Sequence, residues 1–204
     1  MMIVDRRTRI IEAATQSFSL YGYKGSTMDQ IARLAHVGKG TIYRFFPNKE
    51  ELLEAIMKGF IQDILEIAKS SIQQGATFLE NLHRTLHNVL EFRSKHDLMV
   101  VLSHEMREMG TEIVMSKIGK VEDALQHFVK EQVELAIHSG ELKSCDAELT
   151  AFLFIRTYVA LAVDWPKRAQ AFHQGQIPQL LEFYLMNGAA QTELRESDNA
   201  IHII

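Results

Sequence analysis

The chain has 204 residues, enough to bury roughly 70% of the surface that its unfolded form exposes, so it can form one large domain or two small ones. A hydrophobic content of 47% and a charged content of 24% are those of an ordinary globular protein and exclude a disordered one. The single cysteine, Cys145, cannot form an intramolecular disulfide, and neither a membrane-spanning run nor a signal peptide is recognisable, so we expect a cytoplasmic protein with no membrane partner.

Charge is distributed unevenly along the chain, whose net charge is only −4. Residues 1–49 carry eight lysines and arginines against three acidic residues, a net charge of +5. The remaining residues carry 14 cations and 23 anions, a net charge of −9. A basic stretch can arise by chance, but this asymmetry favours one region that meets a polyanion and another with a different task.

The N-terminal quarter is predicted to contain three short helices. The first lies in "RIIEAATQSFSLYG", whose apolar residues recur at helical spacing, and Gly22 is its natural end. The second begins at Thr27, where "TMDQ" matches a capping box in which the Thr27 hydroxyl accepts from the N–H of Gln30. After "VGKG", the third helix lies in "GTIYRFF" and is closed by Pro47.

Long amphipathic helices are predicted for the rest of the chain. Asn48 resembles a second helix cap, and the helix that follows it is expected to run to about residue 72. We therefore predict an all-α protein with a helix-turn-helix domain over residues 1–50 and a helical ligand-binding and dimerisation domain over residues 51–204. The helix-turn-helix motif itself spans 27–46, and the linking helix extends that domain to about residue 64. Further helices are expected at 76–95, 97–109, 112–138, 146–164 and 177–191.

Two short helices joined by a tight turn are typical of a helix-turn-helix, in which the second helix enters the DNA major groove. At this point the sequence resembles the TetR family of transcriptional regulators, over "IIEAATQSFSLYGYKGSTMDQIARLAHVGKGTIYRFFPNKEELL", residues 10–53. The chain departs from the family pattern at His36, where a glycine usually stands in the turn. Glycine tolerates positive φ there, whereas histidine reaches that region less easily. His36 is therefore an exposed turn residue or a phosphate contact.

The resemblance assigns DNA-binding roles to seven residues. Thr27 would cap its helix and meet a phosphate, Tyr43 would donate its hydroxyl to a phosphate, and Lys49 would anchor a phosphate on the far side. Gly40 would let the backbone approach the duplex, and Arg44 would reach either a base or a phosphate. Lys39 could bind guanine or only a phosphate, and Thr41 could contact a thymine methyl. The set is Thr27, Lys39, Gly40, Thr41, Tyr43, Arg44 and Lys49.

The resemblance also implies a homodimer on a double-stranded DNA operator and a small apolar or amphipathic effector. The last two helices are the dimerisation candidates, with a buried core inside one subunit as the alternative. Methionines and aromatic residues could form the effector pocket, although each is individually more typical of plain core. The predicted interface residues are Phe152, Ile155, Val159, Val163, Leu181, Tyr184 and Leu185. The predicted pocket residues are Met99, Met106, Phe128, Tyr158 and Trp165.

Other classes of function fit the sequence less well. "HEMRE" at 104–108 lacks the second histidine of a zinc hydrolase, and His83 with His87 lacks an evident third ligand. "GKGT" lacks the serine or threonine and the upstream glycine of a phosphate-binding loop. We therefore assign no catalytic residue, metal or cofactor. A helical ligand-binding or adaptor protein without a DNA role is the alternative to a ligand-released repressor, and it would leave the basic segment unexplained.

Overall fold

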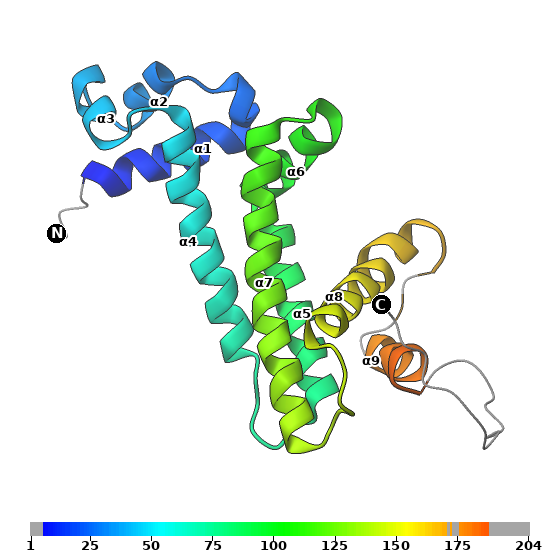
Figure 1. Cartoon of the computed structure of the whole chain (residues 1–204). Helices are drawn as coiled ribbons and strands as arrows, with labels where there is room; N and C mark the ends of the chain where they lie inside the picture. Colours follow the sequence, from blue (N-terminus) through cyan, green and yellow to red (C-terminus); the bar gives the residue numbers. More distant parts are fainter. Residues whose placement is uncertain (1–5, 171, 173–175, 188–204) are drawn as a thin grey trace, which may run out of the picture. The chain divides into compact units, whose positions relative to one another are not determined.

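The computed structural model describes residues 6–170, 172 and 176–187, and every regular element in this part of the chain is helical (Figure 1). The chain separates into two compact units, residues 1–155 and 156–204, which we describe one at a time. None of the described helices is long and apolar enough to cross a membrane. The all-α fold class predicted from helical periodicity is confirmed.

A bundle of three helices opens the first unit. Each helix turns apolar side chains inward, and Phe18, Ile31 and Ile42 are fully buried. Burial of such side chains contributes about 1.5–3 kcal/mol each, so this small core holds the bundle together. The helices are α1 (Arg6–Gly25), α2 (Met28–Leu34) and α3 (Lys39–Phe45).

Local sequence sets where these helices begin and end. The Gln30 N–H donates to the Thr27 hydroxyl at 3.2 Å, and the Glu51 N–H donates to the Asn48 side chain at 2.8 Å. Both caps satisfy a backbone donor that a helix start otherwise leaves unpaired. Both predicted starts are thus confirmed. At Gly22 the backbone is not helical, with φ 73° and ψ 173°, so the predicted break is also real.

The fourth helix continues from the bundle into a second layer of long helices. It packs against the fifth and seventh helices, while the sixth packs against both the first and the seventh (Figure 1). The predicted helices at 76–95, 97–109 and 112–138 are confirmed to within two residues at each end. The predicted domain boundary near residue 50 falls in the first turn of the fourth helix and stays a prediction. These elements are α4 (Lys49–Ser70), α5 (Phe78–Lys95), α6 (Asp97–Met109) and α7 (Glu112–Ser139).

An ion cluster ties α4 to α7. The Glu54 carboxylate accepts from the ammonium groups of Lys117 and Lys120, the latter at 2.9 Å. The Lys117 side chain is only 9% exposed, and its ammonium also lies 3.9 Å from Glu50. Hydrogen bonds from Lys117 and then Lys120 lower the pKa of Glu54 to about 2. The cluster keeps Glu54 charged and fixes the lateral position of α7 on α4.

The C-terminal elements depart from the simple helices that periodicity predicted. Helix α8 (Ala147–Val159) crosses from the first unit into the second and gives way to a π-helical turn, Ala160–Asp164, where the sequence predicted one helix over 146–164. Helix α9 (Gln176–Leu181) likewise continues as a π-helix, Glu182–Asn187. Residues 188–191 of the predicted last helix lie outside the described residues.

Candidate nucleic-acid interface

Helix α3 presents one face to the protein and the other to solvent. Ile42 is fully buried, whereas Tyr43 is 41% exposed and Arg44 is exposed as well. At its start Lys39 and Gly40 are exposed, and the preceding residue, Gly38, offers no side chain to cap the helix. The leading turn of α3 therefore faces outward, as a helix that reads base edges must.

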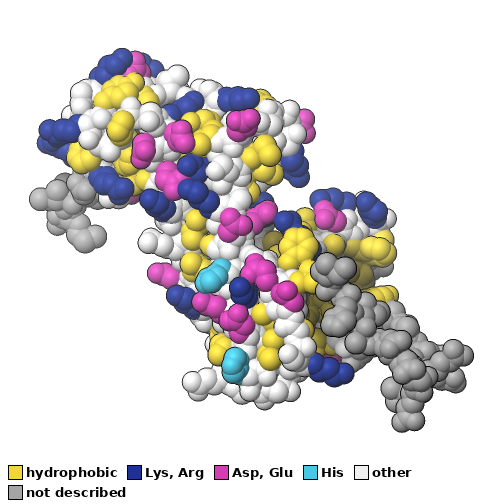
Figure 2. Space-filling model, in the orientation of Figure 1, with side chains coloured by type: hydrophobic (Ala, Val, Ile, Leu, Met, Phe, Trp, Pro, Cys, Tyr) yellow, Lys and Arg dark blue, Asp and Glu magenta, His cyan; other side chains and the backbone are white. Residues whose placement is uncertain are grey.

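Glycine at position 40 has no role in packing within the chain. A Cβ atom added there would meet no other atom within 4 Å. The same holds for Gly38. Small residues at the outer start of a helix leave room for an external backbone to come close, which is the role predicted for Gly40. Figure 2 shows lysine and arginine side chains spread over the surface of this N-terminal bundle.

The exposed polar residues predicted to contact DNA have different partners within the protein. The Lys39 ammonium lies 3.1 Å from the Asp29 carboxylate, and this hydrogen bond raises the pKa of Lys39. The Arg44 guanidinium stacks 5.7 Å from the centre of the Phe45 ring. Thr27 is exposed, and its oxygen accepts the capping bond while its own O–H remains a donor. These groups can reach a duplex without breaking the core.

Lys49 lies in a different environment from the one predicted. Its ammonium donates to the carbonyl oxygens of Tyr23 at 2.6 Å and Ser26 at 2.9 Å, and it lies 4.4 Å from the centre of the Tyr23 ring. Burial lowers the pKa of Lys49. The ammonium thus holds the turn between α1 and α2, and its predicted phosphate contact stays a prediction.

Lys39 and Lys49 are expected to respond in opposite ways to replacement by alanine. Lys39→Ala should lower the slope of log affinity against log salt for duplex DNA by about one, with little change in stability. Lys49→Ala should mainly destabilise the protein, by about 1–3 kcal/mol, because it leaves two carbonyl groups without a partner. Anisotropy titrations at several salt concentrations and thermal melts measure the two effects. A full-unit slope change with unchanged melting of Lys49→Ala would restore its phosphate role.

His36 has the backbone conformation that its place in the turn predicted. Its φ is +52°, the one positive value among the described residues other than glycine, and the side chain is exposed. The turn therefore carries mild backbone strain that a glycine would remove.

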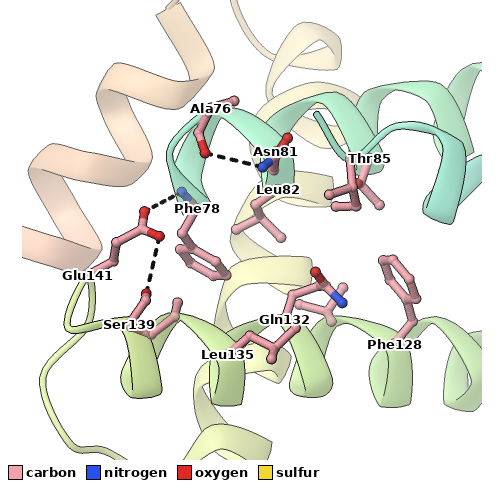
Figure 3. Close-up of a pocket in the computed structure, with 13 residues that line it drawn as sticks. Ala76, Phe78, Asn81, Leu82, Thr85, Phe128, Gln132, Leu135, Ser139 and Glu141 are labelled. Atoms are coloured by element: carbon pink, nitrogen blue, oxygen red, sulfur yellow. Dashed lines mark hydrogen bonds between the residues drawn. The ribbon is translucent and has the colours of Figure 1, made fainter. Parts of the chain in front are cut away.

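A cavity of about 310 Å³ lies at the other end of the first unit, between α5 and α7 (Figure 3). Phe78, Leu82 and Phe128 line it with apolar surface. The Thr85 hydroxyl is buried on the same wall and has no hydrogen-bond partner. Polar groups converging on a mostly apolar cavity are typical of a small-molecule site.

The five residues predicted to line an effector pocket differ in burial, and the set as a whole stays a prediction. Phe128 lines the cavity between α5 and α7. Met99 is 1% exposed, Met106 is half-buried, and neither lines this cavity. In the second unit, Tyr158 is buried and Trp165 is 44% exposed. The sequence did not predict the burial of Thr85, because nothing in its spacing marks a hydroxyl for burial, and the same holds for the carboxylate of Glu105 on α6, a residue only 5% exposed.

The predicted interface residues differ in exposure within one chain. Tyr184 is 56% exposed, Phe152 46% and Val163 39%, whereas Leu181 is fully buried. The other three, Ile155, Val159 and Leu185, are half-buried. His83 and His87 stack at 5.9 Å, and no group of three metal-ligating side chains was found in the described part of the chain.

Comparisons with known proteins agree with this geometry. The profile of the family described as "Bacterial regulatory proteins, tetR family" matches residues 10–56. An uncharacterised helix-turn-helix transcriptional regulator of Bacillus subtilis, YhgD, is 43% identical over 187 residues, which cover 92% of this chain and 98% of the relative. The fatty acid metabolism regulator protein of the same organism is 27% identical over 166 residues, covering 80% and 85% of the two chains.

A solved structure shares the fold across nearly its whole length. The crystal structure of the regulator FadR from Bacillus subtilis in complex with stearoyl-CoA has a TM-score of 0.66 and 26% identity, covering 85% of this chain and 96% of that one. These relationships do not favour a helical adaptor without a DNA role. With its outward-facing recognition helix, this chain belongs to the TetR family of bacterial transcriptional regulators.

Proposed function

We propose that the protein is a repressor that acts in the cytoplasm, holds a palindromic operator as a homodimer and releases it when an acyl thioester binds. The recognition helix supplies the DNA contacts, and the cavity between α5 and α7 takes the acyl chain of the effector. The cavity size is at the lower end of the range for small-molecule sites, which suits a chain whose polar head stays outside. Operator DNA and the acyl thioester would favour different conformations of the protein, so binding of the acyl thioester weakens binding of DNA.

The observation that carries the choice of ligand is the Thr85 hydroxyl. A buried hydroxyl without a partner is costly, and Thr85 is one of the residues that line this mostly apolar cavity (Figure 3). A ligand that is apolar along its length and carries one carbonyl oxygen would fill the cavity and accept this hydrogen bond. An acyl thioester has both features, and the FadR relative was solved with stearoyl-CoA.

The proposal is tested by release of DNA. Operator fragments are first selected from random DNA with the full chain, and stearoyl-CoA is then titrated against the complex, with free coenzyme A as the control ligand. We expect stearoyl-CoA to release the operator and coenzyme A to leave it bound. Operator binding that is unaffected by saturating acyl thioesters of several chain lengths would exclude this class of effector.

Thr85→Val supplies the matched change in the protein. Valine keeps the shape and removes the hydroxyl, so the variant should need about five- to tenfold more stearoyl-CoA for half-release, equivalent to about 1 kcal/mol. The ligand-free variant should melt at the same or a higher temperature, because the unpaired hydroxyl is gone. Thr150→Val, at a half-buried site on α8 away from the cavity lining, is the control. An unchanged half-release concentration for Thr85→Val would remove the hydroxyl from the ligand site.

A further inference from the structure

Glu105, on α6, is a buried carboxylate whose hydrogen bonds reach across to the DNA-binding bundle. The residue is only 5% exposed. It accepts from the backbone N–H groups of Tyr23 at 2.7 Å and Lys24 at 3.2 Å, and from the Thr111 hydroxyl at 3.2 Å. A buried charge is costly unless such bonds stabilise it. The chain therefore keeps a carboxylate at a place where an apolar side chain would pack more cheaply.

The backbone of α1 is shaped to receive this carboxylate. The conformation of Gly22 interrupts the helix, so that the next two N–H groups both donate to Glu105. A Cβ atom on Gly22 would lie 2.7 Å from one carboxylate oxygen. Successive backbone N–H groups that converge on one anion form a binding concavity for it. Gly22 thus serves the contact in two ways, through its positive φ and through its missing side chain.

Lys49 holds the same turn through its carbonyl groups. Its ammonium donates to the carbonyl oxygens of Tyr23 and Ser26, whereas the Glu105 carboxylate accepts from the N–H groups of Tyr23 and Lys24. The two charged groups belong to α4 and α6, and both helices pack on α7. Thr111, at the turn between α6 and α7, completes the link to the helix that lines the cavity.

We propose that Glu105 is the positioning residue through which α6 and the α6–α7 turn set the placement of the helix-turn-helix, so that DNA binding and the state of the larger domain are coupled through its carboxylate. Hydrogen bonds to a carboxylate weaken steeply with distance and angle. A shift of α6 must therefore carry the turn at residues 22–26 with it or break both bonds. If the turn moves with α6, the helices α2 and α3 that follow it move as well; if the bonds break, the turn is released from α6. The coupling works in both directions. It requires DNA binding but no particular effector.

The test follows hydrogen exchange of backbone amides when the full chain binds duplex DNA of random sequence at low salt. In the wild-type protein, DNA should slow exchange in α2 and α3, and also in α6 and the first turns of α7, which lie outside the helix-turn-helix. Glu105→Gln keeps the size of the side chain and one acceptor oxygen, but its amide nitrogen cannot accept from a backbone N–H, so one of the two backbone bonds is lost. In this variant the slowing in α6 and α7 should disappear while that in α2 and α3 remains. Without DNA, the amide of Tyr23 or Lys24 that loses its acceptor should exchange about tenfold faster.

Two further variants separate coupling from simple stabilisation. Glu108→Gln makes the same chemical change at an exposed site on α6 and should behave as wild type. Thr111→Val leaves both backbone bonds to Glu105 intact and removes only the link to the α6–α7 turn, so slowing should persist in α6 and weaken in α7. If Glu105→Gln does not fold, the DNA-dependent slowing of exchange in α7 of Thr111→Val tests the proposal by itself. DNA-dependent slowing in α6 and α7 that survives Glu105→Gln, that is unaltered in α7 by Thr111→Val, or that is absent from the wild type would overturn the proposal.

Discussion

Replacing Tyr184 with glutamate is expected to convert the protein to a monomer and to lower its operator affinity by at least two orders of magnitude. Tyr184 is 56% exposed and Phe183 beside it is 51% exposed, with ring centres 5.0 Å apart. Exposed aromatic residues next to one another on a helix are typical of a surface that a partner covers. A carboxylate buried in that surface would cost more than the contact provides.

The size of the effect comes from bivalency. One recognition helix makes only a few base contacts, and a dimer binds its second half-site as an intramolecular step, which raises apparent affinity by about 10²–10⁴. A monomer loses this gain on a palindromic operator but keeps most of its weak affinity for a single half-site. The expected result is therefore a large loss on the full operator and a small one on the half-site.

Sedimentation at micromolar concentration and anisotropy on full and half operators measure both parts of this prediction. Met115→Glu places the same charge on α7 at a side chain that is 49% exposed, and should leave the dimer intact. The predicted interface would be wrong if Tyr184→Glu remained a dimer with wild-type affinity, or if the unmodified chain sedimented as a monomer.

Gly22→Ala is expected to destabilise the protein by about 2–3 kcal/mol. At φ 73° and ψ 173° the residue occupies a region that is nearly restricted to glycine, where another residue costs about 1–3 kcal/mol. The added Cβ would also displace the Glu105 carboxylate, which three hydrogen bonds hold in place. Denaturant unfolding measures the change, and hydrogen exchange at Tyr23 and Lys24 should report it locally.

Gly59→Ala is the matched control and should change stability in the opposite direction. Gly59 lies inside α4, and a Cβ added there would meet no atom within 4 Å. Alanine is favoured over glycine in a helix interior by about 0.5–1 kcal/mol, so this variant should be more stable. Equal and small effects at both positions would mean that the break at Gly22 carries no strain.

Sequence patterns predicted those parts of the fold that depend on near neighbours. Thr27 and Asn48 cap helices through bonds to residues three positions away, and Gly22 and His36 act through their own φ. Such features can be predicted because the capping side chain and the N–H group that it binds lie within one helical turn, and because a residue's φ depends on its own type. The outward face of α3 followed from the same kind of pattern, since Ile42 is buried and Tyr43 is not.

Features that depend on distant partners could not be predicted. Tyr21 fits the apolar stripe of α1 but is 55% exposed, because the helix breaks at the next residue. Hydrophobic spacing also cannot distinguish an α-helix from the π-helical turn that follows Val159. Lys49 and Glu105 meet the same turn from positions 56 residues apart in the chain, and a cation and an anion at that separation give no signal in one sequence.

Because α4 binds carbonyl groups of the turn through Lys49 and α6 binds its N–H groups through Glu105, a motion that the two helices share would carry the turn along and keep both sets of bonds. Sliding of α4 against α6 would instead strain or break one set. An effector that left α4 and α6 in the same relative position would therefore leave this turn, and the helices that follow it, as they were. Small molecules that displace α4 relative to α6 should be the potent inducers. Resistance to induction should arise from substitutions that fix α4 and α6 to one another.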